Sequence, residues 1–311
     1  MDHSDAQRND FDVIIVGGGA AGLSAALVLA RLRVSVLVVD GGEPRNRFSY
    51  AMHGFLSRDG MHPQSFLTIG RQEVVAYGVR VQAGHATHME GSLGNFALVL
   101  NGTRTTAARV VIATGLTDRL PELEGAAPLW GNRIVHCPFC HGWEVRDSHV
   151  GVIAWHPLSV HQAHLMRRLT NRLEVVPFGI DLDAAALSAL AADQIVVREL
   201  EILRVAPAPD RGVMVFGADG SAHHYDALLM GGTPAANDQL LRQAGCALVD
   251  PPFPMGDGFV RVNAQGETSV PGLYAAGNVV DPTALVIAAT AQGSAVGVAI
   301  VQAMVQETLQ Q

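Results

Sequence analysis

Two cysteines stand three positions apart near the middle of the chain, in the run CPFCH that begins at Cys137 and contains Cys140. Cysteines at this spacing can close a small disulfide ring, and a helix that starts after the first would stabilise a thiolate. His136 and His141 flank the pair, and either could hold a proton or accept one from a thiol near neutral pH. Because the thiolate is the attacking species in thiol–disulfide exchange, a nearby base raises the reactive fraction. These residue types predict a redox-active pair.

Two other chemistries share this cysteine spacing. The pattern C-x-x-C-H also attaches c-type haem, which requires export, but the polar and acidic run 1–10 lacks the features of a secretory signal. A zinc site would need a second pair of ligands, and Cys246 is the only other cysteine. We therefore expect no metal, a buried and inert Cys246, and a location in the reducing cytoplasm.

A glycine-rich loop follows the first apolar run of the sequence. Residues 17–22 read GGGAAG and fit G-x-G-x-x-G between an expected strand and an expected helix. Gly17 would allow the tight turn, Gly19 the close approach of a pyrophosphate, and Gly22 close packing of the helix on the strand. The amino terminus of the helix would offer N–H groups to phosphates, and Asp40 ends the next strand, where an acid can bind ribose hydroxyls. This loop alone fits either NAD or FAD.

Two strand–helix–strand patterns indicate the elements that position these residues. The first begins at residue 11 and holds the glycine loop, and the second begins near residue 149. The length of 311 residues suits two domains, each with its own core. We predict an α/β fold with two Rossmann-like domains, the second inserted into the first. Residues 1–116 and 246–311 would form the first domain, and residues 117–245 the second.

The composition limits the possible partners. A net charge of −8 argues against nucleic acid, because no basic field exists to displace counterions from phosphates. All 21 basic residues are arginine, which excludes chemistry that needs a lysine, such as a Schiff base. The stretch 282–306 carries no charge and is rich in small residues. We interpret it as a buried, closely packed helix and not as a membrane span.

Three features in this order resemble the low-molecular-weight thioredoxin reductases. They are the amino-terminal glycine loop, the central C-x-x-C, and the run TSVPGLYAAGN at 268–278, and the resemblance covers roughly residues 11–305. It implies a homodimer, FAD bound by the discontinuous domain, Cys140 facing the flavin, and Cys137 meeting the substrate. The family usually has aspartate where this chain has Asn278, so we expect FAD to bind with an altered redox potential. It also usually has an aspartate proton donor directly after the second cysteine, where this chain has a histidine.

The residues expected to hold FAD are the glycine loop, the end of the second strand with the loop after it, the strand end before the domain crossing, and the carboxyl-terminal fingerprint. They are Gly17, Gly19, Ala20, Ala21, Gly22, Asp40, Gly41, Arg45, Asn46, Ala113, Thr114, Gly115, Gly277 and Asn278. The expected catalytic residues are Cys137, Cys140, His141 and His136.

The second domain departs from the reductase pattern. Reductases bind the NADPH pyrophosphate with a G-x-G-x-x-A loop, and here Ala154 and His156 occupy the first two glycine positions, while Pro157 removes an N–H group. The next expected strand ends in the run 175–179, without the arginine cluster that holds the 2′-phosphate. Two independent determinants of NADPH binding are missing.

Three runs resemble a particular branch of the family, the dithiol oxidases that close disulfides in gliotoxin, holomycin and romidepsin. They are CPFCHGWE from Cys137, HGFLSRDG from His53, and EPRN at 43–46. The resemblance implies oxidation of a small-molecule dithiol, with O2 as electron acceptor and H2O2 as product. One alternative is a disulfide reductase driven by NADPH or ferredoxin. Another is a non-catalytic flavin-binding partner, against which the intact cysteine pair argues.

Overall fold

The computed structural model describes residues 10–250 and 258–310, and the chain forms two compact units. Unit 1 comprises Met1–Arg47, His62–Thr117 and Pro234–Gln311, and unit 2 comprises Phe48–Met61 and Asp118–Thr233. Each unit contains a mainly parallel sheet with helices, so the predicted α/β fold of two Rossmann-like domains is confirmed.

The boundaries between the units differ from the expected ones in two places. The chain returns to unit 1 at Pro234 and not at residue 246, because the short helix α6 (Gln239–Gln243) inserts Leu240 and Leu241 into the core of unit 1. The segment Phe48–Met61, expected in the first domain, groups with unit 2.

The sheet of unit 1 has the strand order β3-β2-β1-β6-β5-β4, and β19 also pairs with β6. Strands β3, β2, β1, β6 and β19 run parallel, and the β6–β5–β4 hairpins are antiparallel. The strands are β1 (Phe11–Val16), β2 (Val36–Asp40), β3 (Arg80–Ala83), β4 (Ala86–Ser92), β5 (Asn95–Leu100), β6 (Thr103–Ile112) and β19 (Leu273–Ala275), with a separate pair, β17 (Leu248–Val249) and β18 (Phe259–Val260). The other helices are α1 (Ala20–Arg31), α2 (Pro63–Ala76), the 3-10 turn η3 (Gly277–Val279) and α7 (Val286–Leu309).

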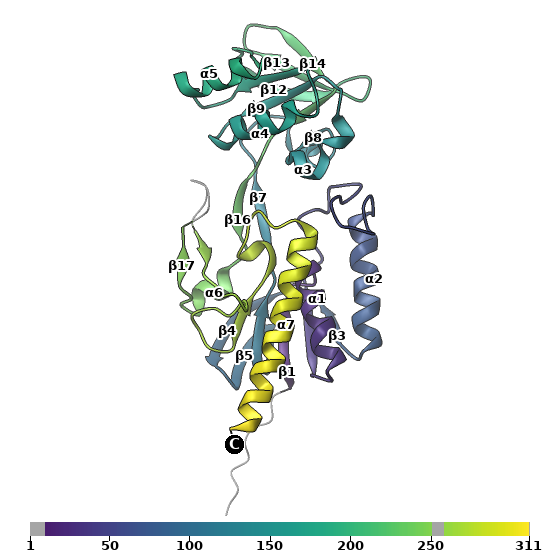
Figure 1. Ribbon diagram of the computed structural model, residues 1–311, viewed down its shortest axis with the longest axis vertical. Coiled ribbons are helices and arrows are strands. Elements are labelled where there is room, and N and C mark those ends of the chain that lie inside the picture. Colours follow the sequence, from purple (N-terminus) through teal and green to yellow (C-terminus); the bar gives the residue numbers. More distant parts are fainter. Residues whose placement is uncertain (1–9, 251–257, 311) are drawn as a thin grey trace, which may run out of the picture. The chain divides into compact units, whose positions relative to one another are not determined.

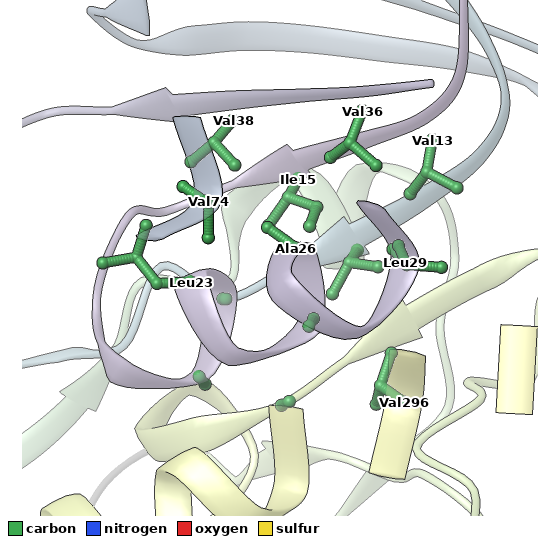
Figure 2. Packing of buried hydrophobic residues seen from close by; sticks show 14 of the residues in the cluster. Val13, Ile15, Leu23, Ala26, Leu29, Val36, Val38, Val74 and Val296 are labelled. Carbon is green, nitrogen blue, oxygen red and sulfur yellow. The ribbon is translucent and has the colours of Figure 1, made fainter. Parts of the chain in front are cut away.

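Alternate residues of β1 supply the cores on the two faces of this sheet. Val13 and Ile15 pack with Leu29 and other residues of α1 on one face, as Figure 2 shows, whereas Ile14 and Val16 face the other side. This alternation follows from the two-residue period of a strand. Strands buried on both faces read as continuous apolar runs, which is why β1 and β2 could be predicted from the sequence.

Helix α7 lies beside α1 in unit 1 (Figure 1). A Cβ atom at Gly293 would lie 2.0 Å from the carbonyl oxygen of Ala21, and one at Gly297 would lie 3.0 Å from that of Ala25. Small residues therefore allow the two helix backbones to approach closely. Among the described residues α7 is the one helix long and apolar enough to cross a membrane, and this close packing supports the interpretation of a core helix.

Unit 2 contains a parallel sheet with the strand order β11-β10-β9-β15-β8 and an antiparallel sheet, β12-β13-β14. Its strands are β8 (Ile134–Val135), β9 (Val150–Ala154), β10 (Leu173–Pro177), β11 (Val196–Val197), β12 (Ile202–Pro207), β13 (Val213–Gly217), β14 (Ala222–Tyr225) and β15 (Ala227–Leu229). The helices are η1 (Ala127–Leu129), α3 (Pro138–His141), η2 (Trp143–Val145), α4 (Leu158–Arg167) and α5 (Ala184–Ala192). At the two crossings between the units, β7 (Leu116–Arg119) pairs with β16 (Thr233–Ala236).

Candidate active site

The cysteine pair lies at the start of the short helix α3. Cys137 is the extended residue before the helix, and Pro138 takes the first helical position, for which its fixed φ is suited. The N–H of Cys140 donates to the carbonyl of Cys137 at 3.2 Å, and the two Sγ atoms are 2.8 Å apart. Both side chains are half-buried thiols. One helical turn therefore brings the sulfurs close enough to form a disulfide with a small shift.

His141 follows Cys140 directly and is held by a residue far away in the sequence. Its Nε2 lies 3.1 Å from Oγ of Ser49, whereas its Nδ1 is buried and has no hydrogen-bond partner among the described residues. Burial lowers the pKa of His141, Glu144 acts in the opposite direction, and His53 lowers it further. The imidazole is therefore neutral at pH 7 and available to accept a proton.

His136, the histidine on the other side of the pair, also lies close to His141. The two rings meet edge to face with centroids 5.5 Å apart, and His136 also contacts the ring of Trp130. The backbone carbonyl of His136 accepts a hydrogen bond from Nε2 of Gln162 on α4. The fold thus brings together all four residues expected to be catalytic.

The segment Phe48–Met61 contacts the chain around α3. Nδ1 of His53 lies 3.4 Å from Asp59, and Nε2 lies 3.4 Å from Glu144. The amide of Asn132 donates to the hydroxyl of Tyr50 at 3.3 Å. The sequence marked the runs from His53 and Cys137 as typical of one branch of a family, but it gave no role to Ser49, His53 or Glu144, which meet only in the folded chain.

The glycine loop of unit 1 has the geometry that a dinucleotide requires. Gly17 has a φ of +111°, and a Cβ there would lie 2.2 Å from the carbonyl oxygen of Ala113. A Cβ at Gly22 would lie 1.9 Å from the carbonyl oxygen of Gly17. At Gly19, in contrast, no atom lies within 4 Å of a Cβ position, and no side chain caps α1. The loop is closed toward the sheet and open beside the helix amino terminus, which fits a bound pyrophosphate.

Asp40 lies at the expected strand end and is already well bonded. Its Oδ1 accepts from the N–H groups of Gly18 and Gly42, and its Oδ2 lies 2.6 Å from the guanidinium of Arg71. Arg71 lies on α2, and no pattern in the sequence indicated this partner. Asp40 therefore links the glycine loop to the loop after β2, and Arg71 balances the charge of a carboxylate that could hydrogen-bond a ribose.

Three other expected residues of the same loop lie nearby in unit 1. Gly41 faces His85, with 2.6 Å between its Cβ position and the ring, so a larger residue would collide there. Arg45 donates to the carbonyl of Pro282 at 3.1 Å, which links this loop to the chain before α7. Asn46 lies half-buried in the following turn.

The strand end at Ala113–Gly115 is fixed to the returning chain. Ala113 bonds to Val16 next to the glycine loop, and the hydroxyl of Thr114 donates to the carbonyl of Asn237 at 2.7 Å. The N–H of Asn237 donates to the carbonyl of Gly115. These contacts fix the strand end beside the glycine loop.

Asn278 in the carboxyl-terminal fingerprint uses its side-chain Nδ2 in two hydrogen bonds. Its Nδ2 donates to the carbonyls of Asp281 at 2.9 Å and Ala284 at 3.0 Å. The N–H of Gly277 donates to Gln292 of α7 at 2.8 Å. Oδ1 of Asn278 is then the atom that can accept a hydrogen bond from a ribitol hydroxyl. An aspartate here would face two carbonyl oxygens, so the surrounding chain is matched to asparagine.

The loop after β9, where the resemblance places the NADPH loop of a reductase, contains a buried histidine. His156 is 7% exposed, and neither ring nitrogen has a hydrogen-bond partner among the described residues. Its Nε2 lies 3.0 Å from the Cβ position of Gly231, whose carbonyl accepts a hydrogen bond from Trp155. Burial lowers the pKa of His156. A buried imidazole thus lies directly before α4, at a position where the reductase resemblance expects a glycine.

The described residues contain no group of three or more His, Cys, Asp and Glu side chains placed to hold a metal ion. Cys246 is buried, and burial raises the pKa of its thiol, so it remains protonated and poorly reactive.

A Rossmann unit with an open glycine loop, followed by a second unit that carries a C-x-x-C dithiol, defines a flavin-dependent disulfide oxidoreductase. Residues 11–293 match the family model described as pyridine nucleotide-disulphide oxidoreductase, and the chain belongs to this family. It is an FAD-dependent thiol/disulfide oxidoreductase of the thioredoxin-reductase-like type.

Several relatives are similar over almost the whole chain. The thioredoxin reductase tcpT of Claviceps purpurea is 31% identical, with 87% of each chain covered. The thioredoxin reductase sirT of Leptosphaeria maculans is 29% identical, with 92% of each chain covered. Among solved structures, the crystal structure of HlmI is 39% identical with a TM-score of 0.91, covering 96% of this chain and 94% of that one.

Proposed function

We propose that the enzyme oxidises a small-molecule dithiol to its intramolecular disulfide through Cys137 and Cys140. The overall reaction is R(SH)2 + O2 → RS2 + H2O2, so two electrons and two protons pass from the dithiol to oxygen. The observation that carries the proposal is His156, which is buried at the start of α4 where a reductase needs an open loop for NADPH. The runs from His53 and Cys137 support the same assignment, because they resemble the dithiol oxidases.

The protein residues would act in the following order. A substrate thiolate attacks Sγ of Cys137 in the enzyme disulfide, and Cys140 leaves as a thiolate. The second substrate thiol attacks the substrate sulfur of the mixed disulfide, which releases the cyclic product and leaves Cys137 reduced. His141 accepts a thiol proton in these exchanges, since burial keeps its imidazole neutral. Bound FAD supplies the two-electron oxidation that restores the disulfide and delivers the electrons to oxygen.

The organisation of the complete enzyme is part of the proposal. Unit 1 would bind FAD through the glycine loop, Asp40 and Asn278, and unit 2 would carry the thiol chemistry without a functional NADPH site. We also propose a homodimer in the cytoplasm, as the family resemblance implies. Light scattering at micromolar concentration would then give twice the chain mass of 32.8 kDa.

The decisive experiment is anaerobic reduction of the purified holoenzyme, followed by its visible flavin absorption. One sample receives dithiothreitol, the other receives NADPH, and air is then admitted to both. Bleaching by dithiothreitol alone, with recovery and stoichiometric peroxide in air, is the expected result. Rapid bleaching by NADPH would instead identify a pyridine-nucleotide-driven reductase, the alternative suggested by the names of the relatives.

A further inference from the structure

The hydroxyl of Ser49 is buried although the residues on both sides of it are exposed. Ser49 is 5% exposed, compared with 48% for Phe48 and 72% for Tyr50. Its Oγ lies 3.1 Å from Nε2 of His141, across 92 positions of sequence. The segment therefore directs one small polar side chain inward, onto the histidine beside the cysteine pair.

Contacts on both sides of Ser49 hold the segment in this position. Before it, the Cβ of Phe48 lies 2.4 Å from the Cβ position of Gly131, so glycine is required for the approach. After it, Tyr50 accepts a hydrogen bond from Asn132, and His53 lies 3.4 Å from Glu144. The placement of Ser49 is thus determined by several independent contacts.

We infer that Ser49 is a positioning residue for the thiol chemistry, one that holds Nε2 of His141 so that Nδ1 exchanges the proton with the cysteine pair. The inference rests on the part of the proposed function that makes Cys137 and Cys140 the redox pair. A neutral imidazole has one donor nitrogen and one acceptor nitrogen. With Nε2–H donating to Oγ of Ser49, the acceptor is Nδ1, the buried nitrogen without a partner among the described residues.

The same hydrogen bond suits both protonation states of His141. Oγ of Ser49 accepts from Nε2–H when the ring is neutral, and accepts more strongly when the ring is an imidazolium. Glu144 on η2 and His53 in the segment act on the charge of His141, and the ring of His136 before α3 lies against its ring. A carboxylate proton donor would need no partner to select the atom that exchanges the proton, because its two oxygens are equivalent. A histidine at this position needs such a partner, because its two ring nitrogens differ.

The test measures the thiols directly, in the reduced holoenzyme without oxygen, substrate or NADPH. The rate of alkylation of Cys137 and Cys140 by iodoacetamide is followed against pH by peptide mass spectrometry. For Ser49→Ala we expect alkylation at pH 7 to fall about tenfold, and the apparent thiol pKa to rise, because one hydrogen bond to the imidazolium is lost. Ser49→Thr keeps the hydroxyl and should retain most of the rate.

Two controls separate a positioning role from a structural one. Tyr50→Phe removes a neighbouring hydrogen bond of the same segment, and its pH profile should match that of the unaltered enzyme. In a His141→Gln background, Ser49→Ala should have no further effect. A profile unchanged by Ser49→Ala, or an equal loss in both backgrounds, would overturn the inference. Since no electron acceptor or donor enters this assay, its result is independent of whether NADPH or a dithiol reduces the flavin.

Discussion

At Asn278 the chain has an amide where the reductase family usually has a carboxylate, and the surrounding backbone offers hydrogen-bond acceptors for that amide. Two backbone carbonyls, those of Asp281 and Ala284, accept both hydrogens of the amide. A carboxylate offers no hydrogens and would repel these oxygens. In the proposed FAD site, the asparagine would therefore remove one negative charge beside the flavin and keep an acceptor for a ribitol hydroxyl. Less negative charge favours the reduced cofactor, which carries more electrons.

Asn278→Asp should lower the two-electron potential of bound FAD. We expect a shift of about 30 mV or more in the negative direction, equivalent to a tenfold change in the equilibrium. Equilibration with reference dyes measures it. Asn263→Asp is the matched control, because Oδ1 of Asn263 accepts from the N–H groups of Gln265 and Glu267, and an aspartate can do the same. An unchanged potential in Asn278→Asp would contradict the argument.

The pH dependence of thiol exchange should follow the environment of His141. Burial lowers the pKa of this histidine, so its base form persists below pH 6.5, and Glu144 limits that lowering. Glu144→Gln removes the negative charge that raises the pKa of His141. We therefore expect the acid limb of the pH profile for flavin bleaching by dithiothreitol to move to lower pH. Glu90→Gln, on an exposed strand of unit 1, should leave the limb in place. A limb that moves upward in Glu144→Gln would show that another group controls it.

The sequence indicated candidate reactive residues, but not the residues that hold them in place. Cys137, Cys140 and the glycine loop carry spacings that local chemistry explains, and the fold places each at the start of a helix. Ser49 and Arg71 carry no such pattern. Their partners lie 92 and 31 positions away, and only tertiary packing decides that they meet.

At the scale of elements, apolar runs predicted the buried strands and the helices that follow them. The helix expected after the glycine loop, α1, ends at Arg31, because Arg33 has a φ of +63°, which breaks the helix. The location of Phe48–Met61 in unit 2 could not be predicted, since the segment is turn-rich and its affiliation depends on contacts with Gly131, Asn132 and Glu144.

Packing of α7 on α1 explains why the carboxyl-terminal helix is rich in small residues. Gly293→Ala would raise helix propensity by about 1 kcal/mol, but its Cβ would lie 2.0 Å from a backbone oxygen that cannot move alone. We expect net destabilisation of about 1–3 kcal/mol, measured by urea unfolding followed by circular dichroism. Gly70→Ala on α2 is the control, because its Cβ would meet only side-chain atoms of Leu23, the nearest being Cδ1 at 3.2 Å, and no backbone atom. That variant should be neutral or stabilised, and a stabilised Gly293→Ala would refute the packing argument.

At the scale of the whole molecule, the two units have separate hydrophobic cores. The clusters around β1 belong to unit 1, and those around β9 and β15 belong to unit 2. The proposed division of labour gives FAD binding to unit 1 and the dithiol to unit 2. Ligand binding stabilises the unit that it contacts, because it favours the folded form by mass action.

Removal of FAD should therefore destabilise the units unequally, and the chain contains a reporter for this. All three tryptophans, Trp130, Trp143 and Trp155, lie in unit 2. We expect apoprotein and holoprotein to show the same midpoint for thermal unfolding when it is followed by tryptophan fluorescence. Circular dichroism, which reports both units, should show an earlier transition in the apoprotein, and added FAD should reverse it. A fluorescence midpoint that falls as far as the circular dichroism midpoint would mean that the units unfold together, and that FAD binding also stabilises the unit that carries the cysteine pair.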